Sequence, residues 1–106
     1  MLPIMDVSRW QGSIDWDKVK ASGLVSSVML RALGNSAEDK PSKPYIDPTF
    51  ERNYAECQRL GIPCGVYYYC KAVNTAESDA ELALLHKVLT GKTLQLPVAV
   101  DIEDSY

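Results

Sequence analysis

Short apolar runs alternate with amphipathic segments along this 106-residue chain. Four runs are rich in β-branched and aromatic residues and predict strands over residues 2–7, 25–32, 62–70 and 96–104. Three segments between them predict helices, because their apolar residues recur at helical spacing or follow a capping residue. These helices are expected to begin after Asp15, after Asp47 or Thr49, and at Thr75, and to end before Gly23, Gly61 and Gly91.

The order of the predicted elements is strand, helix, strand, helix, strand, helix, strand. Such alternation is typical of parallel strands joined by right-handed crossovers. The fold class expected is therefore α/β, with parallel β/α units that form about half of a TIM-like barrel. Residues 33–48 contain three prolines and mixed charges, and they predict a long loop.

The last strand finishes in two carboxylates, Asp101 and Glu103. Residues i and i+2 of a strand share a face, so these side chains point the same way, about 6.5 to 7 Å apart along the backbone. The opposite face carries Val98, Val100 and Ile102. We expect this to be a buried strand, with its apolar face packed against helices.

Two carboxylates held close together in a partly dry place favour retention of one proton at neutral pH. Cleavage of a glycosidic bond requires at least one protonated carboxyl group and one ionised carboxylate. An Asp-x-Glu sequence is also common at exposed strand ends that only meet solvent or cap a helix. The pair alone therefore leaves both interpretations open.

The other predicted strands also carry polar or aromatic side chains near their carboxyl ends, namely Asp6, Arg31, Tyr67 and Tyr69. In parallel α/β folds the chemistry gathers at these strand ends. A guanidinium in so apolar a strand as that of Arg31 needs an acid partner, so Arg31 is either a counter-ion of Asp6 or Asp101 or a substrate-side group. The tyrosines are candidates for stacking on sugar rings or for packing.

Aromatic and thiol residues outside the strand ends receive different interpretations. Trp10 lies in a predicted loop and is a candidate sugar platform, whereas Trp16 is expected to pack its helix. The chain has three cysteines at positions 57, 64 and 70 and a single histidine, His86. This set does not match zinc-ligand spacing, so we interpret the cysteines as reduced core residues and His86 as a surface residue.

Charge and hydropathy exclude two classes of partner. The net charge is −3 and Lys and Arg do not cluster, which argues against nucleic-acid binding. No apolar run approaches the ~18 residues that a membrane span needs. The first predicted strand begins within five residues of Met1, which leaves no room for a signal peptide.

Several motifs in one order give the chain a specific resemblance. They are Asp6-Val7-Ser8, Trp10-Gln11-Gly12, Ile14-Asp15-Trp16, Leu30-Arg31-Ala32, Asp47-Pro48-x-Phe50-x-x-Asn53-Tyr54, Gly61-Ile62-Pro63-x-Gly65-Val66-Tyr67-Tyr68-Tyr69 and the strand 96–103. In this combination the chain resembles the family 25 glycoside hydrolases, the Chalaropsis-type lysozymes. The resemblance extends over essentially the whole chain.

The resemblance implies a lysozyme-type muramidase that hydrolyses the β-1,4 bond between N-acetylmuramic acid and N-acetylglucosamine in peptidoglycan, without metal or organic cofactor. Glu103 matches the general acid of the family, and Asp6 matches the acid at the end of the first strand. Asp101 matches the carboxylate that supports either the oxocarbenium-like centre or the acetamido group of the substrate. Arg31, Tyr67, Tyr69 and Trp10 are the substrate-binding candidates. The implied place of action is the cell wall, reached by secretion or by phage-type release after cytoplasmic synthesis.

The chain departs from the family pattern in two respects. Leu33-Gly34-Asn35 follows Arg31-Ala32 where the family usually has Gly-Tyr-Gly or a similar turn. The family barrel is also roughly twice as long, consistent with the usual size of such barrels. Residues 1–106 therefore resemble its N-terminal portion, without the acid that a later strand supplies.

A half-barrel leaves strand edges unpaired, so we expect self-association through them. Two alternatives to an active enzyme remain open at this point. One is a non-catalytic half-barrel that binds glycan or acts only with a partner chain. The other is a metal-binding domain that uses Asp6, Asp101 and Glu103 as oxygen ligands.

Overall fold

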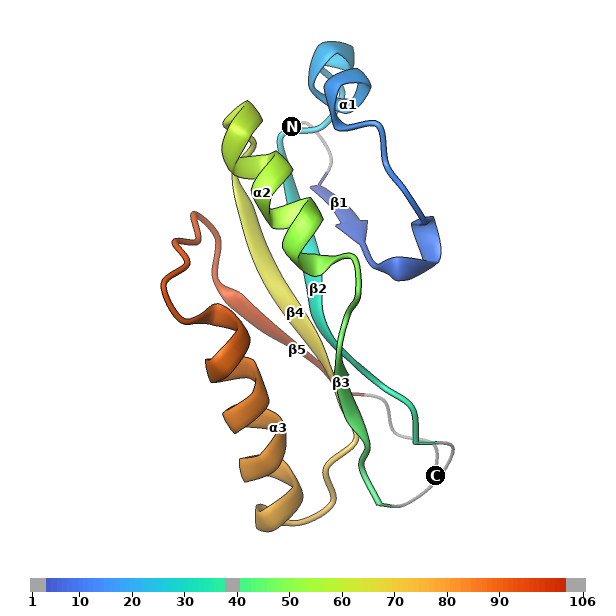
Figure 1. The fold of residues 1–106 in the computed structure, drawn as a ribbon, viewed down its shortest axis with the longest axis vertical. Helices are drawn as coiled ribbons and strands as arrows, with labels where there is room; N and C mark the ends of the chain where they lie inside the picture. Colours follow the sequence, from blue (N-terminus) through green and yellow to red (C-terminus); the bar gives the residue numbers. More distant parts are fainter. Residues whose placement is uncertain (1–3, 38–40, 103–106) are drawn as a thin grey trace.

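The computed structural model describes residues 4–37 and 41–102, so the candidate residue Glu103 lies outside the described residues. Strands and helices alternate along the chain (Figure 1). Their bounds are β1 Ile4–Val7, the 3-10 turn η1 Arg9–Gln11, α1 Trp16–Ser22, β2 Ser27–Asn35, β3 Pro44–Ile46, α2 Phe50–Leu60, β4 Cys64–Cys70, α3 Thr75–Leu89 and β5 Val98–Ile102.

A single sheet organises the molecule. The strand order is β1-β2-β4-β5, and all three pairings along this path are parallel, which confirms the expected α/β class. Strand β3 pairs with β2 in the antiparallel direction. The carboxyl ends of the four parallel strands therefore meet along one edge of the sheet.

The expected capping residues bound α1 and α2, although the Thr49 side chain makes no capping hydrogen bond, whereas α3 begins after Asn74 and ends at Thr90 instead of Gly91. The Asp15 side chain accepts a hydrogen bond from Lys18 N at the start of α1, and Gly23 ends that helix with φ of 67°. Helix α2 ends at Gly61 in the same conformation. At the start of α3 the capping side chain is that of Asn74, which accepts from Glu77 N over 2.9 Å, and the prediction of Thr75 was wrong by one residue.

The core lies between the sheet and the helices. Side chains that alternate along the strands supply it, and residues aligned across neighbouring strands, such as Val7, Leu30 and Val66, are buried together. The Trp16 side chain packs α1 onto α2 as expected, and its indole N–H donates to Asn53 Oδ1 over 2.9 Å. A buried indole needs such an acceptor.

The prediction of a loop over residues 33–48 was wrong at residues 33–35 and 44–46, which are strands. Strand β2 continues to Asn35, and β3 returns along it with Leu33 opposite Ile46. The sequence hides this hairpin because prolines flank β3 and the register of β2 against β4 shifts between Arg31 and Leu33. Residues 44–46 form a strand because their backbone pairs with β2, although the surrounding composition is typical of a loop.

The prediction of a buried last strand was also wrong. All of β5 is exposed, including Val98, Val100 and Ile102 at 43%, 48% and 72%. The reason is its position at the end of the strand order, while α3 packs on β2, β3 and β4. In α3 the buried residues are Glu81, Leu85 and Val88, whereas Ala76, Ala80 and Ala83 are exposed.

Among residues 4–37 and 41–102, no helix has the length and apolar content that crossing a membrane would require.

Candidate active site

The strand register brings five of the candidate residues to one face of the sheet. Arg31 on β2 is aligned with Tyr67 on β4, and Tyr69 is aligned with Asp101 on β5. Asp6 on β1 is aligned with Met29, two residues before Arg31. Aligned residues of parallel strands, and residues two apart on one strand, share a face.

This face is opposite to the helix-covered core, because its residues alternate with the buried ones. Asp6 and Asp101 are exposed, Tyr67 and Tyr69 are half-buried, and Arg31 is buried. The face thus offers two carboxyl groups, two phenols and a guanidinium near the carboxyl ends of the strands. Such a set suits a ligand with many hydroxyl groups.

The Tyr67 hydroxyl lies near charged groups from several elements. Burial raises its pKa above the ordinary value, and the Arg31 guanidinium acts in the opposite direction. The carboxylates of Asp6, Asp47 and Asp101 also raise the pKa of Tyr67. Groups from β1, β2 and β5 therefore lie near enough to act on one phenol of β4.

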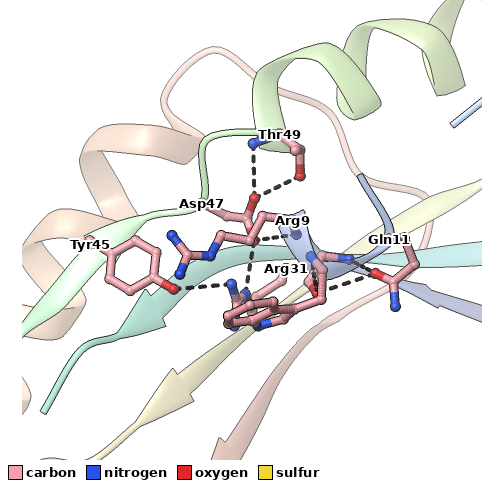
Figure 2. A network of polar contacts seen from close by, with 8 residues as sticks. Arg9, Gln11, Arg31, Tyr45, Asp47 and Thr49 are labelled. Carbon is pink, nitrogen blue, oxygen red and sulfur yellow. Dashed lines mark hydrogen bonds and ion pairs between the residues drawn. The ribbon is translucent and has the colours of Figure 1, made fainter. Parts of the chain in front are cut away.

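Sequence reasoning missed Asp47 as a site residue. Its carboxylate is fully buried and binds groups from three segments (Figure 2). Oδ2 accepts from Arg31 Nε over 2.9 Å and from Arg9 N over 3.0 Å, and Oδ1 accepts from Thr49 N over 2.9 Å and from Thr49 Oγ1 over 2.7 Å. Asp47 is thus the acid partner of Arg31, for which Asp6 and Asp101 had been the expected candidates.

Burial alone would raise the pKa of Asp47, but the hydrogen bonds from Thr49, Arg9 and Arg31 outweigh burial and lower it. The carboxylate is therefore ionised at neutral pH. The signal that could have identified Asp47 was the unpaired guanidinium of Arg31 together with the Asp-Pro-Thr sequence. That sequence was interpreted only as a helix start.

An exposed cationic and aromatic cluster lies next to this ion pair. Arg31 Nη2 donates to Tyr45 Oη over 3.2 Å, and the guanidinium carbon of Arg9 lies 5.3 Å from the centroid of the same ring. That carbon also lies 4.6 Å from the Trp10 ring centroid, and Trp10 is 70% exposed. We call Arg9, Trp10 and Tyr45 the rim cluster, since Arg9 and Trp10 follow directly after β1.

Gly65 allows the segment before β5 to reach the sheet. A Cβ at this position would lie 2.7 Å from Leu96 Cβ, 2.7 Å from Pro97 O and 2.9 Å from Met29 Sδ. The Leu96 backbone N–H donates to Cys64 O over 3.1 Å. The missing side chain therefore fixes how closely the strand that carries Asp101 approaches β4.

A second buried carboxylate, Glu81 on α3, supports the hairpin near the same edge. Its Oε2 accepts from Ser42 Oγ over 2.5 Å and from Lys71 N over 3.2 Å. The Cys70 thiol also interacts with it, and burial together with the hydrogen bond to Glu81 raises the pKa of that thiol. Glu81 joins α3 to the end of β4 and to the residues before β3.

Within the described ranges, no three His, Cys, Asp or Glu side chains form a group that could hold a metal ion. Glu103, the third oxygen ligand of the metal-binding alternative, lies outside those ranges. A cavity of about 260 Å³ lies at the other end of the sheet, beside the turn from α2 to β4, and Cys57, Gln58 and Gln95 are among the residues that line it. It is remote from the acidic face.

Comparison with known proteins gives one family. The model of the family described as glycosyl hydrolases family 25 matches residues 5–106. Lysozyme M1 from Streptomyces globisporus is 32% identical over 71% of this chain and 24% of its own length. The autolytic lysozyme from Clostridium acetobutylicum is 30% identical over 93% of this chain and 27% of its own length.

Solved structures agree with the sequence relatives. The modular autolysin LytC from Streptococcus pneumoniae, in complex with a synthetic peptidoglycan ligand, superposes with a TM-score of 0.80 at 30% identity and covers 94% of this chain. A family 25 glycosyl hydrolase from Bacillus anthracis shares the fold, with a TM-score of 0.75 at 21% identity over the full chain and 44% of its own length. The chain spans about a quarter of the length of the two curated relatives.

Proposed function

The chain belongs to family 25 of the glycosyl hydrolases, and on that basis we propose that it acts in hydrolysis of peptidoglycan. The bond attacked is the β-1,4 link between N-acetylmuramic acid and N-acetylglucosamine. The single observation that carries this proposal is the shared sheet face of Asp6, Arg31, Tyr67 and Asp101. Carboxyl groups from two strands lie on this face, and glycoside hydrolysis typically uses a pair of carboxyl groups.

In the proposed reaction Glu103 donates its proton to the glycosidic oxygen while the bond from that oxygen to the anomeric carbon breaks. The electron pair of the bond leaves with the oxygen, and the positive charge that develops on the sugar is stabilised by the Asp101 carboxylate. Water then supplies the hydroxyl group of the new reducing end and returns a proton to Glu103. Asp6 adds negative charge from β1 on the same face.

The substrate-binding roles divide between exposed and buried groups. Tyr67 and Tyr69 present half-buried rings on the acidic face, and Trp10 presents an exposed one beside it. Arg31 is occupied by Asp47 and Tyr45, which supports a role in holding the site in shape as well as in facing the substrate. The proposal needs no cofactor.

We further propose that residues 1–106 form the N-terminal portion of a lysozyme-like barrel domain that acts at the cell wall. The relatives include an autolytic lysozyme and an autolysin, which supports the cell wall as the target. The exposed apolar side chains of β5 support association of the sheet edges with further protein. A second copy of the chain is the partner we expect for the isolated 106 residues.

The second candidate function is that of a non-catalytic half-barrel that binds glycan and acts only with a partner chain. The exposure of every residue of β5 favours it, because an incomplete barrel leaves one side of the substrate groove open. Under this alternative the chain binds peptidoglycan without cleaving it. The two functions therefore differ in a single measurable outcome.

Clearing of a suspension of bacterial cell walls tests the proposal. We expect the turbidity to fall with the wild-type chain and to remain constant with Glu103→Gln. Glu51→Gln is the matched control, because Glu51 is 63% exposed and pairs with Lys92 away from the acidic face. Binding to the walls without clearing by the wild-type chain would support the non-catalytic alternative.

A further inference from the structure

The Arg9 side chain is held in a fixed place although it is exposed. Its guanidinium carbon lies 4.6 Å from the Trp10 centroid and 5.3 Å from the Tyr45 centroid, so two aromatic rings stabilise one cation. Its backbone N–H is bound by the buried Asp47 carboxylate. An exposed arginine normally samples many rotamers. The two ring contacts favour one placement of the side chain, and the Asp47 bond holds the backbone from which it projects.

The charge of this guanidinium is also available to a ligand. Within residues 4–37 and 41–102, no carboxylate forms an ion pair with Arg9, whereas Arg31 beside it is paired with Asp47. The guanidinium fork matches a carboxylate through two parallel hydrogen bonds. Trp10 is 70% exposed, so its ring has surface left for the apolar face of a sugar.

We propose that the rim cluster of Arg9, Trp10 and Tyr45 is a recognition site for a carboxylate attached to a sugar ring. The guanidinium of Arg9 binds the carboxylate, Trp10 stacks on the ring, and Tyr45 with Asp47 holds Arg9 in place. This inference rests on the proposed function and deepens it, because it assigns the selection of an acidic sugar over a neutral one to residues outside the acidic face.

The carboxylate has two possible sources in peptidoglycan, namely the lactyl group of muramic acid and the peptide attached to it. Three ligands separate them: the disaccharide of N-acetylglucosamine and N-acetylmuramic acid, the same disaccharide carrying its peptide, and the neutral disaccharide N,N′-diacetylchitobiose, called chitobiose below. In the first the lactyl carboxylate is free, whereas in the second it is amidated and only the peptide supplies carboxylates. Chitobiose offers the ring without a charge.

The experiment is a titration of the 106-residue chain with each ligand, followed by the NMR signals of the arginine Nε–H and tryptophan indole N–H groups. We expect at least one acidic ligand to shift the signals of Arg9 and Trp10 and to bind about tenfold more tightly than chitobiose. Whichever acidic ligand does so identifies the source. The indole signal of the buried Trp16 is an internal control, since it is expected to stay in place.

Variants assign the effect to the side chains. Arg9→Gln is expected to remove the preference for the acidic ligand, and Trp10→Ala to weaken binding of all three ligands. Arg59→Gln is the matched control, because Arg59 is an exposed arginine at the carboxyl end of α2 that pairs with Asp17 of α1 and Glu56 of α2. Equal binding of acidic and neutral ligands, or an unchanged preference in Arg9→Gln, overturns the proposal.

The same titration in the Glu103→Gln variant keeps this inference separate from the proposed function. Binding there needs no bond cleavage. Acidic preference without hydrolysis by the wild-type chain would support the rim cluster and contradict the enzymatic function, whereas hydrolysis without acidic preference would do the reverse.

Discussion

The Arg31 guanidinium donates from Nε to Asp47 Oδ2 over 2.9 Å, and both side chains are buried. This ion pair joins β2 to the start of α2. Because the same carboxylate oxygen also accepts from Arg9 N, the pair fixes the loop after β1 as well. The candidate active site and the rim cluster therefore depend on one buried carboxylate.

The first prediction concerns the stability that this carboxylate provides. Asp47→Asn leaves the buried Arg31 charge without a counter-ion, and breaking such a pair costs about 3 to 5 kcal/mol of the free energy of unfolding. Urea denaturation followed by circular dichroism measures the loss. Asp17→Asn is the control, since Asp17 forms an exposed pair with Arg59 and such pairs contribute about 1 kcal/mol or less. Equal losses in both variants would contradict the structural role of Asp47.

The second prediction is a pH dependence. The pKa of Asp47 is lower in the folded chain than its ordinary value of 3.8. Its contribution to stability is therefore fully present above that ordinary value and is lost as the pH falls through the folded-state pKa. We expect the difference in free energy of unfolding between the wild type and Asp47→Asn to be constant near neutral pH and to shrink below about pH 4. A difference that stayed constant into strong acid would contradict the lowered pKa.

Sequence reasoning predicted the parallel architecture because the three helices and the four parallel strands each carry a local signal. Asp15 and Gly23 bound α1, and the run of tyrosines in β4 has high β propensity. It could not predict the partner of Arg31, because Asp47 lies 16 residues away in a segment whose prolines resemble a loop. That pairing exists only once β3 has folded back onto β2.

Sequence reasoning also failed to predict that β5 is exposed. Its apolar alternation indicates burial, and that pattern is a property of the strand alone. Whether a strand is buried depends on what lies beside it, and in the described part of this chain α3 packs on other strands. The sequence therefore predicts which candidate residues share a face of the sheet better than it predicts how deeply each is buried.

The third prediction concerns the approach of β5 to the sheet. In Gly65→Ala the new methyl group would meet the Pro97 carbonyl oxygen at 2.7 Å, so the segment before β5 must move. Overpacking of this kind costs about 1 to 3 kcal/mol. We expect the amide protons of β5 to exchange faster with solvent while those of β1 and β2 are unchanged. If Gly65→Ala left exchange in β5 unchanged, or raised it equally in all strands, Gly65 would not set the position of Asp101.

The fourth prediction concerns assembly of the isolated chain. Val98, Val100 and Ile102 expose apolar surface on β5, and exposed strands of this kind promote association. Sedimentation velocity is expected to show a concentration-dependent dimer. Val100→Lys should shift the equilibrium to the monomer, with Lys87→Glu on the exposed face of α3 as a control that leaves it unchanged. A folded wild-type monomer at every concentration would contradict self-association.

The central proposal is that Asp101 and Glu103 cleave the glycan so that muramic acid is left at each new reducing end. The direct measurement is mass spectrometry of the fragments released from purified peptidoglycan after reduction of their new reducing ends. The account predicts reduced N-acetylmuramic acid at those ends with the wild-type chain, and its loss in both Asp101→Asn and Glu103→Gln. Reduced N-acetylglucosamine at the new ends, or undiminished release by either variant, would contradict it.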